Sequence, residues 1–414
     1  MVIAGINRIA GGLAGMDLTR IAMLDSALQS PQEREAASTI PVYSQFSFVP
    51  LRADGCDIIT TDDRHILDLY GGHAVAALGY GHPRLMQAIR EQSQRLLFQS
   101  NAVALDIRAQ AAEKLVSIAP DNLTRVFFVN SGAEANENAL RIACMATGRG
   151  KVLAITHGFH GRTAASAAVT WNAGDSWYGF PNTPFAVEFI PRNDVAAARA
   201  MIDDTVAAVI FEPVQGVAGA FDFAKEFVQA LRDASRKCGS ILIADEVQSG
   251  MGRSGQYFAV ENHGIEPDIL TSAKSLGGGF PCGAVLTNEY LASLMKPGDL
   301  GSTFGGGPVA AAAIIAVIDT IESESLLANV REREAEIRQH CVVGPVTGIQ
   351  GMGLLLGLIC DRPAREVQSA LLEHDILTGT SADPSVLRLL PPLILRSEHV
   401  HRLAKALASV SPKS

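Results

Sequence analysis

One lysine lies in a stretch of small residues where it could react with a carbonyl group. Lys274 is the only charged residue between positions 269 and 285, and no carboxylate lies within five positions of it. A lysine that is partly withdrawn from water shifts towards its neutral amine, which is the form that attacks a carbonyl. An ordinary loop lysine is the alternative, and this stretch alone does not decide between the two.

Two carboxylates follow an apolar segment a short distance upstream. Asp245 and Glu246 come directly after the predicted strand 241–244, and Asp245 precedes Lys274 by 29 residues, about one strand–crossover–strand unit. Open α/β sheets bind ligands at the carboxyl ends of their strands. An acid and a lysine at neighbouring strand ends suit pyridoxal phosphate (PLP), with the lysine on the aldehyde and the acid on the ring nitrogen. A helix N-cap is the simpler interpretation of Asp245 taken alone.

A possible phosphate site lies where another predicted strand, 126–129, turns into a helix. Ser131, Gly132 and Ala133 are small, so a ligand could approach the N–H groups at the helix start, and the helix dipole favours an anion. Most turns of this kind bind nothing, so this is weak support by itself.

The segment 157–162, His-Gly-Phe-His-Gly-Arg, follows the predicted strand 152–155 on the same sheet edge. Phe159 could lie flat on a cofactor ring, and Arg162 could bind a carboxylate through two hydrogen bonds. An inward-packed loop aromatic beside a solvated arginine explains the segment equally well.

Short apolar strands that alternate with helices predict a mainly parallel, doubly wound α/β sheet. Past Gly307 the pattern changes: Pro308 begins a long Ala/Ile helix, and a smaller α+β unit follows it. We expect an N-terminal arm and part of a small domain in residues 1–70, a large domain in 71–307 and a C-terminal small domain in 308–414. The expected strands include 56–60, 66–70, 187–190, 206–211, 352–359 and 386–390, and the expected helices include 133–145, 227–235, 308–323, 330–339, 365–374 and one capped by Ser397.

Length and composition narrow the class of protein. The 414 residues suffice for two domains, and 48% apolar with 19% charged residues describe a globular chain. A net charge of −9 without any Lys/Arg run argues against nucleic acid. Six scattered cysteines without a CxxC pair are typical of reduced cytoplasmic thiols and predict no metal site. No apolar run is long enough to cross a membrane, and residues 1–24 lack the features of a secretory signal.

Seven motifs occur in order along the chain: NSGAEANENAL, HGFHGRT, FEPVQG, ADEVQSGMGRSG, DILTSAKSLGGGFP, GSTFGGGP and RLLPPL. From about Pro41 onward the sequence resembles the class III (subgroup II) aminotransferases of PLP fold type I. Within this family it is most similar to the acetylornithine aminotransferase branch, with ornithine and 4-aminobutyrate aminotransferases as relatives. The resemblance implies a large, mainly parallel sheet domain and a smaller α+β domain built from the N- and C-terminal segments.

The resemblance also implies how PLP is held. Lys274 matches the Schiff-base lysine that shuttles a proton, and Asp245 matches the acid that keeps the pyridine nitrogen protonated. The other implied contacts are Val247 and Phe159 on the two ring faces, Gln248 on the ring hydroxyl, and Ser131, Gly132 and Ala133 at the phosphate.

For the substrates, the resemblance implies that Arg162 holds the α-carboxylate of an acylated ornithine and that Arg388 holds the α-carboxylate of glutamate. Ser302 and Thr303 match residues that a partner subunit contributes to the phosphate and substrate, which implies a homodimer with shared sites.

Two departures from the family pattern bear on the substrate. The usual QGEGG or QGEAG reads Gln-Gly-Val-Ala-Gly at 215–219, so Val217 replaces a glutamate that covers the arginine equivalent to Arg388. Glu212 is the nearest acid in sequence that could substitute for it. The usual GGNP also reads Gly-Gly-Pro at 306–308, with Gly307 in place of asparagine.

The sequence therefore predicts a cytoplasmic PLP-dependent ω-aminotransferase that moves a terminal amine from an acetylornithine-like donor to 2-oxoglutarate by a ping-pong mechanism. Ornithine, 4-aminobutyrate or carrier-bound lysine are alternative donors. A PLP-fold protein used for binding or regulation is the alternative from a different class. The presence of Lys274, Asp245, Arg162 and Arg388 counts against it.

Overall fold

The computed structural model describes residues 30–410, and the chain divides into two compact units. The described part of one unit comprises residues 30–51 and 60–63 and contains α2 (Pro31–Ser38). The Ser30 side chain caps α2 through the backbone N–H of Glu33, and the Glu33 side chain accepts from the backbone N–H of Ser30. The other unit comprises residues 52–59 and 64 onward and holds the candidate site. The predicted arm, residues 1–24, lies outside the described residues, and the predicted domain boundaries stay a prediction.

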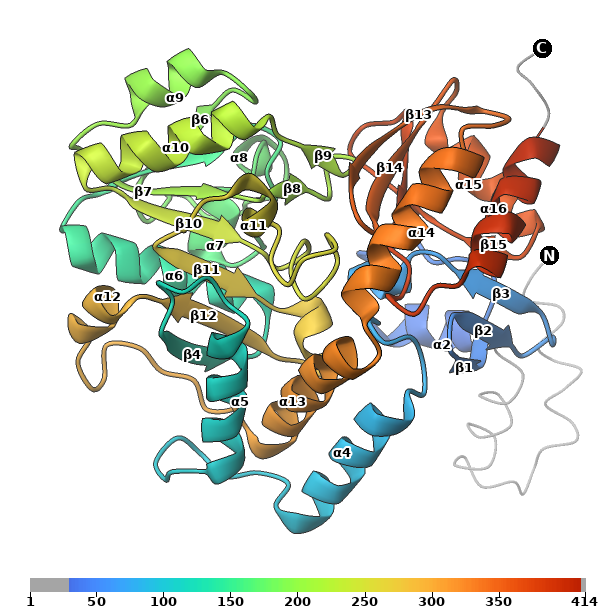
Figure 1. Ribbon diagram of the computed structural model, residues 1–414, viewed down its shortest axis with the longest axis horizontal. Coiled ribbons are helices and arrows are strands. Elements are labelled where there is room, and N and C mark those ends of the chain that lie inside the picture. The colour runs from blue at the N-terminus through green and yellow to red at the C-terminus, as the bar shows by residue number, and fades with distance from the viewer. Residues whose placement is uncertain (1–29, 411–414) are drawn as a thin grey trace, which may run out of the picture. The chain divides into compact units, whose positions relative to one another are not determined.

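The second unit contains a seven-stranded sheet in the order β4-β12-β11-β10-β7-β5-β6 (Figure 1). β12 runs antiparallel to its neighbours β11 and β4, whereas the pairs among β11, β10, β7, β5 and β6 are all parallel. The prediction of a mainly parallel α/β sheet is therefore confirmed. The strands are β4 (Arg125–Val129), β5 (Lys151–Ile155), β6 (Ala186–Ile190), β7 (Val206–Phe211), β10 (Ile241–Asp245), β11 (Ile269–Ser272) and β12 (Gly283–Thr287).

Helices cover both faces of this sheet, and the alternation of side chains along β10 shows how. Leu242 and Ala244 join the apolar cluster that includes Phe227 of α10 (Lys225–Cys238). Ile243, which points the opposite way, joins the cluster that includes Ala139 of α6 (Gly132–Thr147). Burial of each large aliphatic side chain in such a cluster contributes about 1.5–3 kcal/mol. The sheet is thus fixed in the middle of two apolar layers, and its strand ends are held in place.

Two long helices begin at the prolines that the sequence analysis placed at first helical positions. Pro83 and Pro308 lie at the first positions of α4 (Pro83–Arg95) and α13 (Pro308–Ser323). α13 packs against α4 and α5 (Asp106–Ser117) and is followed by the charged helix α14 (Leu326–His340).

The C-terminal part contains a second sheet, ordered β13-β14-β17-β16. Its strands are β13 (Val346–Met352), β14 (Leu355–Cys360), β16 (Gly379–Thr380) and β17 (Val386–Leu389), with helices α15 (Ala364–Glu373) and α16 (Ser397–Ser409). β15 (Ile376–Leu377) instead pairs in parallel with β3 (His65–Asp68), which is antiparallel to β2 (Asp57–Thr60). Residues near both ends of the described chain therefore share one small sheet.

The remaining elements are short, and most had no clear sequence signal. They are β1 (Pro50–Asp54), β8 (Val214–Gln215), β9 (Phe221–Asp222), α3 (Gly71–Ala74), α7 (Ala164–Ala168), α8 (Ala173–Ser176), α9 (Val195–Met201), α11 (Val260–His263), α12 (Glu289–Ser293) and the 3₁₀ helix η2 (Lys274–Gly277).

Two local predictions were wrong. The expected strand 352–359 is the turn and second strand of a hairpin, because the chain reverses between Met352 and Leu355. Gly353 makes this turn with a φ of +59°, where a side chain is disfavoured. Ser397 is the first helical residue of α16 and not its cap, which is Arg396.

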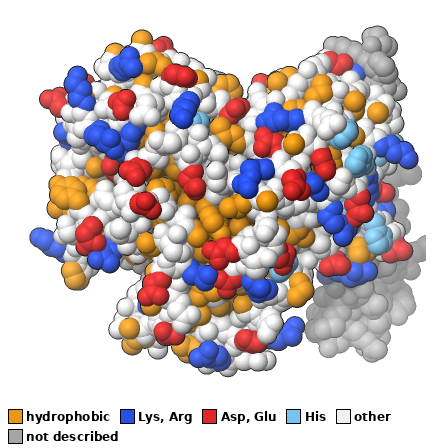
Figure 2. All heavy atoms as spheres, viewed as in Figure 1, with side chains coloured by type: hydrophobic (Ala, Val, Ile, Leu, Met, Phe, Trp, Pro, Cys, Tyr) orange, Lys and Arg blue, Asp and Glu red, His pale blue; other side chains and the backbone are white. Residues whose placement is uncertain are grey.

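Charged side chains of both signs are intermixed over the face shown in Figure 2. Within residues 30–410, no helix combines the length and the apolar character needed to cross a membrane.

The hairpin turn gives a stability prediction. A Cβ on Gly353 would lie 2.4 Å from the carbonyl oxygen of Arg253, whereas a Cβ on Gly148, also at positive φ, would meet nothing within 4 Å. Gly148→Ala should cost about 1–2 kcal/mol from backbone strain alone, and Gly353→Ala should cost about 1–3 kcal/mol more because backbone must move. Thermal unfolding midpoints at one scan rate compare the two variants. A larger drop for Gly148→Ala would show that the close approach at Gly353 does not limit stability.

Candidate active site

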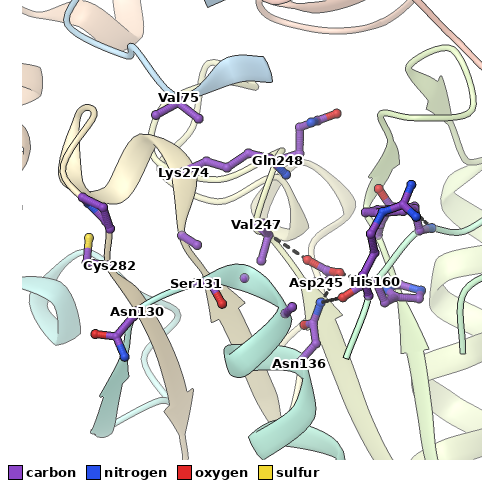
Figure 3. A pocket seen from close by; sticks show the side chains of 18 of the residues that line it. Val75, Asn130, Ser131, Asn136, His160, Asp245, Val247, Gln248, Lys274 and Cys282 are labelled. Atoms are coloured by element: carbon purple, nitrogen blue, oxygen red, sulfur yellow. Dashed lines mark hydrogen bonds and ion pairs between the residues drawn. The ribbon is translucent and has the colours of Figure 1, made fainter. Parts of the chain in front are cut away.

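Asp245 ends β10 with its side chain on the α6 side of the sheet. The strand alternation that sends Ile243 towards α6 does the same for Asp245 and sends Glu246 the other way. Asp245 is buried, and its Oδ1 accepts from the backbone N–H of Val247 at 3.0 Å. Its Oδ2 lies 2.7 Å from both Asn136 Nδ2 and His160 Nδ1 (Figure 3). A buried carboxylate is stable in this position because polar groups bond both of its oxygens.

Asn136 and His160 are functional candidates that the sequence reasoning missed. Asn136 lies in α6 and accepts from the Thr271 hydroxyl through Oδ1, at 2.7 Å, while its Nδ2 donates to Asp245 and to the carbonyl of His160. The His160 side chain is fully buried, and its Nε2 has no hydrogen-bond partner among the described residues. Asn136 lies four residues after Gly132, so helical spacing could have placed it on the same face of α6 as the phosphate turn.

Lys274 begins η2, directly beyond β11, and β11 is the parallel neighbour of β10. Its φ of +47° lies in the left-handed region, which costs a non-glycine residue on the order of 1 kcal/mol or more and persists only where surrounding contacts hold it. Burial lowers the pKa of Lys274, the positive charge of Arg388 adds to this, and the carboxylates of Asp245 and Glu212 oppose it. The structure thus holds Lys274 in a strained, partly desolvated position at the strand end next to that of the acid.

A cavity of about 430 Å³ joins these groups (Figure 3). Its walls come from the start of α6, the loops after β5, β7 and β10, and the segment 273–282 after β11. The predicted site residues that line it are Ser131, Gly132, Ala133, Phe159, Arg162, Glu212, Asp245, Val247, Gln248 and Lys274, together with Val217.

The start of α6 fits an anion. Ser131 is the N-cap residue, with its Oγ accepting from the backbone N–H of Glu134. Gly132 must be small because an added Cβ would lie 2.5 Å from Val247 Cγ1. A Cβ on Gly283 would lie 2.7 Å from the carbonyl oxygen of Ser131, so the strand that leaves the lysine loop packs directly on the turn.

Val247 and Gln248 follow the acid into the cavity (Figure 3). Gln248 is buried, and its Oε1 has no hydrogen-bond partner within residues 30–410. A buried carboxamide oxygen without a partner costs free energy unless a ligand or water satisfies it. Phe159, which is half-buried, also lines the cavity, so a flat polar ring between Val247 and Phe159 would lie beside an unpaired amide.

The two arginines come from different parts of the unit. Arg162 is exposed, and its guanidinium carbon lies 4.2 Å from the ring centre of Trp177. Arg388, on β17, is buried and donates to the carbonyls of Thr380 and Gly216 and to the hydroxyl of Tyr70. Neither arginine has a carboxylate within 4 Å in the described part of the chain. Arg162 therefore presents a guanidinium to the cavity, whereas the buried Arg388 is not among the residues that line it.

Glu212 does not pair with Arg388. Its two oxygens accept instead from the backbone N–H groups of Phe159, at 2.9 Å, and Gly216, at 3.3 Å. Burial raises the pKa of Glu212 to about 7, and His160 and Lys274 oppose the shift. The carboxylate still raises the pKa of Arg388 through space, although burial lowers it overall.

Ser302 and Thr303 have different surroundings. Ser302 Oγ accepts from the N–H of Gly305 and from Asn130 Nδ2, whereas the Thr303 side chain is exposed. Neither residue lines the cavity. Gly307 is the N-cap of α13 and makes no side-chain cap, so the helix start relies on Pro308.

Residues 40–410 match the family described as aminotransferase class-III. The chain belongs to the class III aminotransferases. Among its relatives, the acetylornithine/succinyldiaminopimelate aminotransferase of Yersinia pestis is 38% identical over 392 residues, which cover 90% of this chain and 95% of the relative.

Solved class III enzymes also share the fold. The ornithine aminotransferase of Toxoplasma gondii superposes with a TM-score of 0.86 at 26% identity, covering 94% of this chain and 96% of that one. The acetylornithine aminotransferase of Elizabethkingia anophelis gives 0.81 at 28% identity, covering 91% and 97%. Class III aminotransferases use PLP and need an amino donor and a keto acceptor. The unpartnered Gln248 Oε1, the Gly132 turn and the Asp245–Lys274 pair fit that cofactor.

A comparison of variants of the two adjacent acids, Asp245 and Glu246, distinguishes a role in the active site from the effect of burial alone. Glu246 is as buried as Asp245, but it does not line the cavity and accepts from Ser249 and Val260. Burial raises the pKa of Glu246 to about 7, so glutamine closely matches its protonated form. In steady-state assays, Asp245→Asn should lower kcat/KM by about 10² or more, and Glu246→Gln should change it by no more than about threefold. The assignment fails if Glu246→Gln is the more damaging change.

Proposed function

We propose that this class III aminotransferase transfers the terminal amine of an N-acylated ornithine to 2-oxoglutarate, giving a semialdehyde and glutamate. The observation that carries the proposal is that Arg162 and Arg388 are both free of carboxylate partners in residues 30–410. Arg162 lines the cavity, and the positive charge of Arg388 lowers the pKa of Lys274. Two such cations provide one carboxylate site for each half-reaction.

PLP, when bound, supplies an aldehyde that captures amines and a ring that withdraws electrons. Lys274 would hold the aldehyde, and Asp245 would hold the proton on the ring nitrogen. Because burial lowers the pKa of Lys274, its Nζ is more often neutral than that of a solvated lysine and is free to move a proton at the carbon that bears the reacting amine. Ser131, Gly132 and Ala133 would bind the phosphate through the start of α6.

The absence of a carboxylate cover on Arg388 favours an acylated donor. With Val217 in the cavity wall and Glu212 bonded to backbone, Arg388 stays cationic when an ω-amine donor enters. A free amino acid can place its α-carboxylate on Arg388 and present its α-amine to the cofactor. An acyl group on the α-nitrogen prevents reaction in this wrong orientation, because the acylated amine cannot react with the aldehyde. The name of the Yersinia pestis relative, which includes acetylornithine and succinyldiaminopimelate, supports an N-acylated substrate.

A donor screen tests the proposal. The holoenzyme is supplied with 2-oxoglutarate and one donor at a time: N-acetylornithine, N-succinyldiaminopimelate, ornithine, 4-aminobutyrate or lysine. Glutamate formation should be fastest with an N-acylated donor, and Lys274→Ala should abolish it, since loss of the proton-transfer group alone costs about 10²–10⁴. Faster turnover of free ornithine than of both acylated donors would refute the substrate assignment. Near-normal turnover in Lys274→Ala would refute the mechanism.

We also propose a homodimer with shared sites. Thr303 is exposed and does not line the cavity of its own subunit. The neighbouring Phe304 lies with its ring centre 5.1 Å from that of Phe98, and Phe304 is 63% and Leu97 68% exposed. Exposed apolar groups of this size favour a protein contact.

Mixing two inactive variants tests the shared site. Lys274→Ala and Thr303→Ala proteins should regain activity together, because a mixed dimer holds one site with both native residues. The control is each protein mixed with itself. If subunit exchange is demonstrated by mass and no activity returns, the sites are not shared through Thr303.

A further inference from the structure

Four consecutive residues near the site have left-handed backbone angles. Gly71, Gly72, His73 and Ala74 have φ values of 56°, 57°, 65° and 67°. Glycine adopts this conformation freely, but His73 and Ala74 each cost on the order of 1–2 kcal/mol there. Such a turn persists only where surrounding contacts hold it in place.

Those contacts are present on both sides of the turn. Asp68 Oδ1 accepts from the backbone N–H groups of Tyr70, at 2.7 Å, and Gly71, at 2.9 Å. Ser275, the residue after Lys274, donates its hydroxyl hydrogen to the carbonyl of Ala74 at 2.8 Å. A Cβ on Gly71 would lie 2.6 Å from the carbonyl oxygen of Leu390, so the turn also packs on the strand end that carries Arg388. The turn is tied to both the lysine loop and β17.

The turn brings Tyr70 and His73 together beside Arg388. Tyr70 Oη lies 2.7 Å from His73 Nδ1 and 3.2 Å from Arg388 Nη2. The Arg388 guanidinium carbon is also 5.6 Å from the centre of the Tyr70 ring. Gly379 leaves room for that ring, because a Cβ there would lie 2.0 Å from Tyr70 Cε2.

The hydrogens in this chain of contacts have one consistent arrangement. A guanidinium only donates, so the Tyr70 oxygen accepts from Arg388, and the Tyr70 hydroxyl hydrogen is left for His73 Nδ1. This arrangement requires a neutral imidazole. Burial lowers the pKa of His73, and the charges of Arg388 and Lys274 lower it further, which agrees with a neutral ring.

We propose that Tyr70 and His73 orient Arg388 for the α-carboxylate of the dicarboxylate substrate. They do so in place of the covering glutamate that the family pattern has at position 217, where this chain has valine. The proposal rests on the proposed function, in which Arg388 receives that carboxylate. Arg388 uses one N–H on each of its three nitrogens, towards Thr380, Gly216 and Tyr70, which leaves one N–H on each terminal nitrogen. A hydroxyl group orients the guanidinium without neutralising it. No ion pair of Arg388 therefore has to break between the two half-reactions.

The test measures the two half-reactions separately by stopped-flow absorbance on the holoenzyme, one with glutamate and one with the best amine donor of the screen. Tyr70→Phe removes the acceptor for Arg388 and should weaken apparent glutamate binding about tenfold, the range of a hydrogen bond to a charged group. The amine-donor half-reaction should change by less than about twofold. His73→Gly relieves the left-handed strain, removes the partner of Tyr70, and should shift glutamate binding in the same direction.

Tyr257→Phe is the matched control. Tyr257 is half-buried like Tyr70, but its hydroxyl is bonded to Glu322, and it does not line the cavity. Its loss should leave the ratio of the two half-reactions unchanged. Equal effects of Tyr70→Phe on both half-reactions, no effect on either, or the same change of ratio in Tyr257→Phe would overturn the proposal. If Tyr70→Phe does not fold, His73→Gly decides by the same criterion.

Arg388→Lys separates this inference from the function on which it rests. If Arg388→Lys does not weaken glutamate binding, Arg388 is not the α-carboxylate site, and both proposals fall. If Arg388→Lys weakens glutamate binding and Tyr70→Phe does not, only the role of Tyr70 and His73 is wrong.

Discussion

The candidate site depends on one buried carboxylate, Asp245. A charge at the end of a central strand is costly to withdraw from water unless its oxygens are bonded from several directions. Here the partners come from α6, from the loop after β5 and from the next residues of its own chain. Satisfying this carboxylate fixes α6, with its phosphate turn, and the loop of Phe159 and Arg162 relative to β10. Because Lys274 follows the adjacent strand, the same constraint sets its distance from the acid.

Much of the fold could be predicted because it depends on short-range patterns. The strands at 206–211 and 241–244, the proline-started helices and the parallel order follow from apolar runs, turn residues and strand–helix alternation. The hairpin at Gly353 was missed because its first strand, β13, is largely polar and half-exposed, so only the apolar second strand, β14, had a recognisable pattern. Short elements such as β8 and β15 depend on partners that are distant in sequence or too brief to form a pattern.

The residues of the candidate site likewise fall into those that could be recognised in the sequence and those that could not. Lys274 and Asp245 could be recognised because each follows a strand and stands out chemically from its neighbours. Asn136 had only its helical spacing from Gly132 as a signal, and His160 had none, because its role depends on the fold bringing it to Asp245 and Asn136. Tyr70 and Arg388 are more than three hundred positions apart, and their contact depends on Gly379 and on a strained turn. The loss of a glutamate at Val217 was visible in the sequence, but the groups that now contact Arg388 were not.

The strand order has a consequence for how the chain is made. β4 completes its pairing only with β12, and β3 pairs with β15, which follows the whole of the large sheet in sequence. A growing polypeptide that emerges from the ribosome therefore carries the unpaired apolar strand β4 until the other strands of its sheet have been made. Non-local pairing of this kind slows folding and exposes surfaces that aggregate. The phosphate turn and the turn at Gly71–Ala74 can acquire their final contacts, with Gly283 and Leu390, only after these later segments have been made.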